Sequence, residues 1–254
     1  APRANSWAWP DGAVLRLQLY NGTTRTPATA TYSASTAAWT ISGVQAAQLA
    51  ATGSCRAYFF DGATTAASQS AVTLGATVGV YGDEDGTYVY DGSAITASLA
   101  LKPLTSRLRF TQPTATTVSS ITVEGISYYT AYDATDGLFT TSGAALTLNC
   151  DNDTYTYHYI YGTFGDASAR QLALTNSTDG SDVTFTRTFA TDVFQTGKSG
   201  TLTIPTKADH SGWTMADNTP HTTAASSPLT FAATPAAPQT IAVTSNEQWT
   251  ATSS

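Results

Sequence analysis

Charge is scarce in this 254-residue chain. Only 11% of its residues are charged, against roughly 25% in ordinary globular proteins. The only lysines are Lys102, Lys198 and Lys207, and the net charge is −7. This balance argues against nucleic acid as a partner, because binding to phosphates needs clustered cations. The sequence also lacks any run of about 18 apolar residues, so we expect no transmembrane helix.

The residues that usually carry catalysis are equally few. Cys55 and Cys150 are the two cysteines, and no CxxC pair indicates a zinc or redox site. We expect two buried free thiols, with a disulfide as the alternative. The three histidines are scattered, and neither HExxH nor GxSxG is present. We therefore expect no enzyme, no cofactor and no catalytic residue.

Two short acidic stretches deserve a separate interpretation. They are "DEDG", beginning at Asp83, and "DND", beginning at Asp151. A 12-residue calcium loop beginning at Asp83 would need an acid at its last position, where Ala94 stands. We interpret both stretches as solvated turns, with an irregular calcium site as the alternative.

The positive signal is alternation with a period of two residues. Leu15, Leu17 and Leu19 alternate with polar side chains, and Val183 and Phe185 repeat the pattern. Such alternation is typical of a half-buried antiparallel strand. Gly- and Asp-rich turns separate these segments at intervals that favour β-sandwiches. The sequence predicts an all-β protein.

Changes in composition suggest where the chain divides. A Gly- and Asp-rich region ends near residue 98, and residues 217–227 have no apolar anchor and resemble a linker. We predict one β-sandwich over 1–98 and a second over 99–216. Residues 217–254 are predicted to hold the linker and a β-hairpin.

Tyrosines recur at every second position of one predicted strand. They are Tyr155, Tyr157, Tyr159 and Tyr161, so they share one face. An aromatic face of this kind could stack on sugar rings, which makes it a candidate glycan-binding surface. The alternative is that these tyrosines are half-buried strand residues with hydroxyls at the solvent edge.

Three segments resemble the fimbrillin-like (type V pilin) family of bacterial surface proteins. They are "PRANSWAWPDGAVLRLQL" from Pro2, "ITASLALKPLTSRLRF" from Ile95 and "GTLTIPTKADHSGWTM" from Gly200. The resemblance covers residues 3–216. It implies two transthyretin-like Greek-key β-sandwiches in tandem, located at the bacterial cell surface or in a fimbrium.

The resemblance also implies how such a subunit assembles. Family precursors are cut after an arginine near the first strand, which opens a groove for a strand from a neighbouring subunit. Arg3 matches that position, and Arg25 is the alternative. The implied partners are other fimbrial subunits, with host or dietary glycans or host surface proteins as further candidates. An outer-membrane lipoprotein anchor is expected upstream of Ala1.

The last 28 residues resemble the first half of a BACON domain. The matching pattern is two short strands followed by Ser245, Asn246 and Trp249. Such modules accompany carbohydrate-active and surface proteins. Three alternatives stay open for residues 227–254: a module that is cut short, a hairpin that docks on this chain, or a strand donated to another subunit. We expect a fimbrial subunit or adhesin, with a glycan-binding surface lipoprotein as the alternative.

Overall fold

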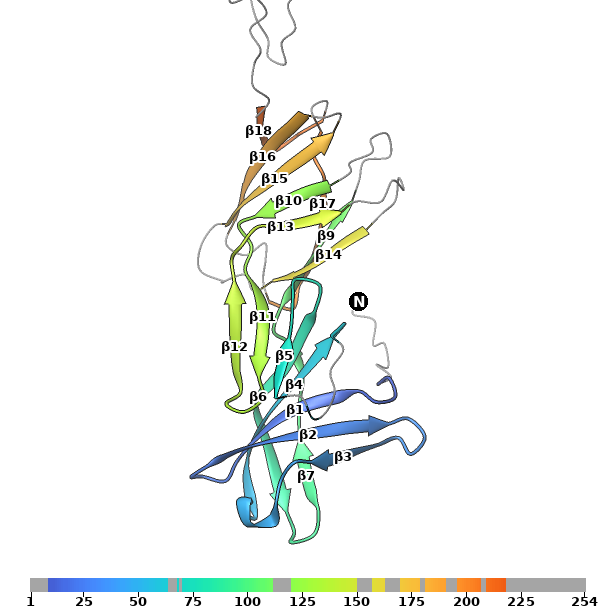
Figure 1. Cartoon of the computed structure of the whole chain (residues 1–254), viewed down its shortest axis with the longest axis vertical. Helices are drawn as coiled ribbons and strands as arrows, with labels where there is room; N and C mark the ends of the chain where they lie inside the picture. The colour runs from blue at the N-terminus through green and yellow to red at the C-terminus, as the bar shows by residue number, and fades with distance from the viewer. Residues whose placement is uncertain are drawn as a thin grey trace, which may run out of the picture.

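The computed structural model describes residues 9–63, 68, 70–111, 120–149, 157–162, 170–178, 181–190, 196–206 and 209–217. Within these ranges the chain forms strands and a single turn of 3-10 helix, η1 (Ala46–Gln48). The prediction of an all-β protein is confirmed. The molecule is elongated, with one group of strands toward each end of its long axis (Figure 1).

A seven-stranded antiparallel sheet forms one end of the molecule. Its strands run in the order β3-β2-β1-β4-β6-β7, and the short β8 pairs with β6. Their bounds are β1 (Val14–Tyr20), β2 (Arg25–Ser33), β3 (Ala38–Ser42), β4 (Thr52–Asp61), β6 (Gly79–Tyr90), β7 (Ile95–Ser98) and β8 (Lys102–Pro103).

Three smaller sheets complete the fold. One runs β12-β11-β5, with β5 (Ala71–Thr73), β11 (Tyr128–Asp133) and β12 (Leu138–Ser142). The five-stranded sheet runs β13-β10-β15-β16-β18, with β10 (Ser120–Glu124), β13 (Leu146–Asn149), β15 (Arg170–Thr178), β16 (Ser181–Phe189) and β18 (Thr214–Asp217). The last runs β14-β9-β17, with β9 (Ser106–Thr111), β14 (Tyr157–Gly162) and β17 (Ser199–Thr203), and β17 lies parallel to β9.

Buried side chains form three clusters between and over these sheets. One joins Leu108 and Phe110 of β9 to Ile121 of β10 and Leu172 of β15, so it fills the space between two sheets. The second joins β4, β5 and β11. The third lies on the other face of the seven-stranded sheet. That sheet is therefore buried on both faces at its centre.

Strand β1 is buried on its polar face as well as on its apolar face. Its alternation is as predicted, with Leu17 and Leu19 in the third cluster. However, Arg16 and Gln18 are only 1% and 2% exposed. The prediction of a half-buried strand is wrong here, because the β12-β11-β5 sheet packs over the face that carries them.

The division at residue 98 stays a prediction. Two strand pairings cross that position: β8 pairs with β6 in the seven-stranded sheet, and β5 pairs with β11. Val72 of β5 is the register partner of Tyr132 of β11. A contact therefore joins segments from both predicted sandwiches. The predicted linker and hairpin of 217–254 lie outside the described residues, apart from Asp217 at the end of β18.

Candidate functional site

One face of the seven-stranded sheet is hollowed by two adjoining apolar cavities. The first has a volume of about 410 Å³ and is lined by Trp9, Leu15, Leu17, Ala30, Trp39, Ile41, Ile95, Thr96, Ala97, Leu99 and Leu101. The second, of about 360 Å³, shares Trp9, Leu99 and Leu101 and extends to Phe59, Tyr81 and Pro103. We call this pair of cavities the apolar groove. Because β3 and β7 both line it, the two ends of the sheet curl toward each other across this face.

The register of three strands explains the depth of the groove. Leu15 of β1 pairs with Ala30 of β2, and Ala30 pairs with Ile41 of β3. Side chains at paired positions stand on the same face, so these three form a row. The methyl group of Ala30 is far shorter than the side chains of its two neighbours, and all three residues line the first cavity, where Leu15 and Ala30 are 5% and 3% exposed. A small residue between two larger ones thus makes the hollow.

Trp9 lies at the point where the two cavities meet. Its ring packs edge-on against Trp39 of β3, with the ring centroids 5.0 Å apart. It packs in the same way against Phe59 of β4, also at 5.0 Å. Trp9 is only partly buried. It therefore bridges β3 and β4 and lines both cavities.

The strands that border the groove end the described sheet. In the described part of the chain, β3 pairs with β2 and β7 pairs with β6, each along one side. Trp39 and Ile41 of β3 are half-buried toward the groove, and Ile95 and Ala97 repeat that pattern on β7. An edge strand with an alternating apolar face is a template on which a further strand can pair.

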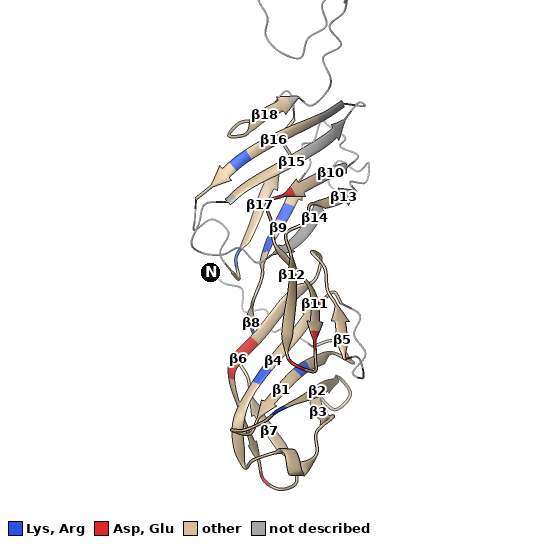
Figure 2. Ribbon diagram, turned by 60° about the vertical axis from the view of Figure 1, so that its left-hand side comes forward, with Lys and Arg blue, Asp and Glu red and all other residues tan. Residues whose placement is uncertain are grey.

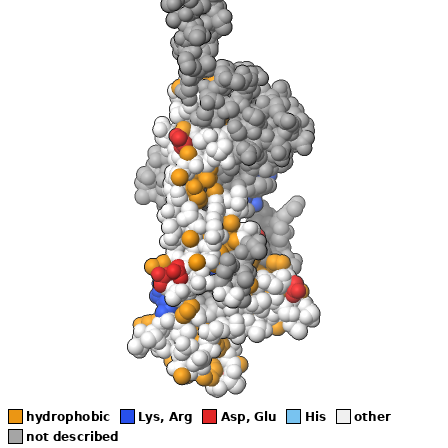
Figure 3. Space-filling view, viewed as in Figure 1, with side chains coloured by type: hydrophobic (Ala, Val, Ile, Leu, Met, Phe, Trp, Pro, Cys, Tyr) orange, Lys and Arg blue, Asp and Glu red, His pale blue; other side chains and the backbone are white. Residues whose placement is uncertain are grey.

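The apolar surface is accompanied by little charge. Charged positions are few and mostly single along the strands, apart from the three consecutive acidic residues of β6 that begin at Asp83 (Figure 2). In the space-filling view, apolar side chains gather in several small groups, one of them at the lower end where the seven-stranded sheet lies (Figure 3). A partner for this region would accordingly be recognised by shape, apolar contact and backbone hydrogen bonds.

Of the two predicted processing sites, only Arg25 is described. It begins β2, and its backbone pairs with Tyr20 of β1. Its side chain is exposed, and Nη1 donates to the Asp136 carbonyl oxygen at 3.5 Å. Arg3 lies outside the described residues. Cleavage after either arginine stays a prediction.

The predicted tyrosine face falls partly within the described backbone. Strand β14 contains Tyr157, Tyr159 and Tyr161, which pair with Thr111, Arg109 and Arg107 of β9. These tyrosines occupy alternate positions of one strand. Their side chains, and all of Tyr155, lie outside the described residues, so glycan stacking on this face stays a prediction.

The carboxylates near Asp83 bind neighbouring protein groups. Asp83 Oδ1 accepts the backbone N–H of Asp85 at 3.0 Å, and Oδ2 accepts that of Ala100 at 2.6 Å. Glu84 accepts a hydrogen bond from the Tyr58 hydroxyl at 3.2 Å. Asp83 therefore anchors the start of the segment after β7. The described residues contain no group of three His, Cys, Asp or Glu placed to hold a metal ion, and residues 151–153 lie outside them.

Cys55 is a free thiol in β4 and is fully buried. Burial, with a smaller contribution from the nearby Asp83 carboxylate, raises the pKa of this thiol to about 12. It is therefore protonated and unreactive at neutral pH. Cys150 lies outside the described residues.

No family model matches the chain, and no curated protein matches it significantly. Among solved structures, one similar chain is provisionally named a cell adhesion protein from Bacteroides uniformis; it is 15% identical, with a TM-score of 0.45 over 82% of this chain and 91% of that one. A second, from Bacteroides fragilis and named likewise, is 14% identical, with a TM-score of 0.42 over 83% and 86%. A fimbrial protein from Bacteroides ovatus is 10% identical, with a TM-score of 0.35 over 78% and 44%. Similarities this weak carry no argument about function.

No helix among the described residues is long and apolar enough to cross a membrane.

The groove itself was not predicted from the sequence. Its signal was present in "AWTIS" and "ITASLAL", two alternating segments with small residues between larger ones. What could not be read is that Ala30 lies opposite Leu15 and Ile41, because that depends on strand register.

Proposed function

We propose that this protein is a structural subunit of a cell-surface fimbrium or adhesin, not an enzyme, and that it assembles by accepting a β-strand from another subunit. The apolar groove is the single observation that carries this proposal. It combines a hollow apolar floor with two bordering edge strands. These are the two requirements for strand addition, in which backbone pairing gives affinity and side-chain pockets give register.

The donor strand is proposed to come from residues 227–254 of a second copy. Leu229 and Phe231 alternate in that segment, as do Ile241 and Val243. An alternating strand places one set of side chains on the groove floor and the other toward solvent. The space above Ala30 would accept one of the larger apolar side chains. The fimbrillin-like resemblance of residues 3–216 supports the same mode of assembly and a location at the bacterial surface.

The proposal is tested by placing a large side chain on the face of β7 that lines the groove. Ala97 is half-buried and lines the groove, whereas the adjacent Ser98 is exposed on the opposite face. We expect Ala97→Trp to fill the groove and Ser98→Trp to leave it open. The purified chain and both variants are treated with an arginine-specific protease and run unboiled on a denaturing gel.

The parent chain and Ser98→Trp should form ladders of polymers, and Ala97→Trp should stay monomeric. A parent chain that stays strictly monomeric at high concentration after cleavage would rule out strand donation. Polymers of Ala97→Trp equal to those of the parent would show that this groove is not the acceptor.

A further inference from the structure

The two cavities of the apolar groove share a wall that belongs to no strand. This wall is the segment 99–101, which lies between the end of β7 at Ser98 and the start of β8 at Lys102. Leu99 and Leu101 line both cavities. Both β7 and β8 pair with β6, so the ladder along this side of β6 is interrupted where the wall crosses it. Regular strand pairing therefore does not hold the wall in place.

A bulge in β6 lies beside the wall. Residues 83–86 of β6, the acidic "DEDG" stretch, fall between the positions that pair with β7 and with β8. On the β4 side, Glu84 and Asp85 lie opposite Arg56 alone, so β6 has one residue more than its partner there. A bulge of this kind bends a strand and turns its side chains in new directions.

The Asp83 carboxylate joins this bulge to the wall. Its Oδ2 atom accepts the backbone N–H of Ala100, in the middle of the wall, at 2.6 Å. Its Oδ1 atom accepts the backbone N–H of Asp85, within the bulge, at 3.0 Å. Hydrogen bonds to a carboxylate are shorter and stronger than those between neutral groups. One side chain thus fixes the wall to β6 between the two leucines that line the groove.

Gly86, at the other end of the bulge, allows Leu99 to lie close against β6. A Cβ atom on Gly86 would lie 2.7 Å from Leu99 Cδ2 and 2.5 Å from the Cys55 carbonyl oxygen. Both distances are shorter than a van der Waals contact, so the leucine fits because position 86 has no side chain. The bulge therefore holds the wall at two points, the backbone of Ala100 and the side chain of Leu99.

We propose that Asp83 is a positioning residue of the apolar groove: it holds the shared wall in place, and the capacity of the groove to accept a strand depends on it. The second part rests on the proposed function, whereas the first concerns the chain by itself. A wall that is loose must be ordered as the strand enters, which costs conformational entropy. A wall that is held beforehand avoids this cost.

Two variants of Asp83 test the proposal. Asp83→Ala removes both hydrogen bonds. Asp83→Asn keeps the shape of the side chain, and its amide oxygen can still accept one of the two N–H groups. We therefore expect the asparagine variant to lie between the parent chain and the alanine variant, which is a partial rescue by the conservative substitution.

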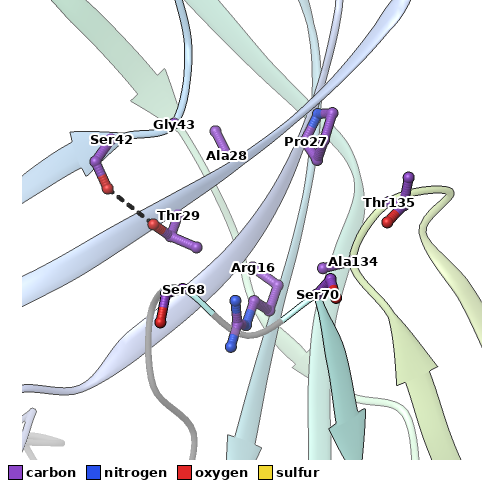
Figure 4. Close-up of a pocket in the computed structure, with 10 residues that line it drawn as sticks. All are labelled: Arg16, Pro27, Ala28, Thr29, Ser42, Gly43, Ser68, Ser70, Ala134 and Thr135. Carbon is purple, nitrogen blue, oxygen red and sulfur yellow. Dashed lines mark hydrogen bonds between the residues drawn. The ribbon is translucent and has the colours of Figure 1, made fainter.

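Two controls separate this effect from a general loosening of the sheet. Asp91→Ala is the matched control, because Asp91 Oδ1 also accepts two backbone N–H groups, those of Ser93 at 2.9 Å and Ala94 at 2.8 Å, and Asp91 lines neither cavity. Thr29→Val is the second control. It removes the 2.9 Å hydrogen bond between the Thr29 and Ser42 hydroxyls, which lie beside a separate cavity on the opposite face of the sheet (Figure 4).

Hydrogen–deuterium exchange of the whole, uncleaved chain tests the first part. It is read by mass spectrometry on peptides that cover residues 97–104. We expect exchange in this segment to be about tenfold faster in Asp83→Ala than in the parent, which corresponds to about 1.4 kcal/mol, and Asp91→Ala and Thr29→Val should match the parent. Equal exchange in Asp83→Ala and the parent, or the same acceleration in either control, would overturn the proposal.

The polymer assay on unboiled gels tests the second part. It is run at a temperature at which circular dichroism shows every variant to be folded, so that differences in stability do not enter. We expect cleaved Asp83→Ala to form polymers about tenfold more slowly than the parent, and both controls to equal the parent. Equal rates despite faster exchange would show that the groove does not depend on Asp83. A parent chain without polymers would refute strand donation and the second part with it, while the exchange data would still decide the first.

Discussion

Replacing Trp9 with alanine should lower the free energy of unfolding strongly, although Trp9 is only partly buried. Among the described residues, the ring makes edge-on contacts with Trp39 and Phe59, each with centroids 5.0 Å apart. Such contacts contribute about 0.5–1.5 kcal/mol each beyond area burial. Together with about 1 kcal/mol for the buried part of the ring, we expect a loss of about 2–4 kcal/mol in the free energy of unfolding.

The assay is urea denaturation followed by far-UV circular dichroism, because the substitution removes a fluorophore. Trp213→Ala is the control: Trp213 is also partly buried but makes one edge-on contact, with Phe189, at the longer distance of 6.2 Å. We expect its loss to be about half as large. A loss below about 0.5 kcal/mol for Trp9→Ala, or a larger loss for Trp213→Ala, would refute the view that Trp9 clamps β3 to β4.

Three further outcomes follow from particular side chains. Gly53→Ala should lower the free energy of unfolding by at least about 2 kcal/mol, because the new Cβ would overlap the Tyr20 carbonyl oxygen. Gly75 has open space around it, so Gly75→Ala should be neutral or should raise the free energy of unfolding by about 0.4–1 kcal/mol. Similar denaturation midpoints for the two variants would contradict this. In a Cys150→Ser variant, the Cys55 thiol should resist Ellman's reagent at pH 8 in the folded protein and react in 6 M urea, since burial raises its pKa to about 12. Fast reaction in the folded variant would show that β4 is open. Burial and Glu84 raise the pKa of Tyr58 to about 12, so the folded state holds this proton more tightly than the unfolded state does. The contribution of Tyr58 to stability should therefore be complete below pH 10 and fall as the pH rises to 12. Tyr58→Phe should reduce the difference between the urea midpoints at pH 9 and pH 11.

The strands themselves were readable because they depend on local pattern. Alternation identified β1 from Leu15 to Leu19 and β16 from Val183 and Phe185, and the structure confirms both. Hydrophobic periodicity reports which side chains share a face, and this property needs no knowledge of distant segments.

Pairing between distant segments could not be read in the same way. β17 lies parallel to β9, although about ninety residues separate them, and β5 pairs with β11 across the predicted division. The burial of Arg16 has the same origin. Its alternation with leucines indicated a solvent-facing polar side chain, and only the packing of β11 over that face places it in the interior.

Strand β1 therefore has two different environments. Leu15 and Leu17 form part of the groove floor, and Arg16, between them in sequence, points to the opposite face. Successive side chains of a strand point to opposite faces. A strand that is added in the groove can therefore contact the leucines of β1, and it cannot reach Arg16.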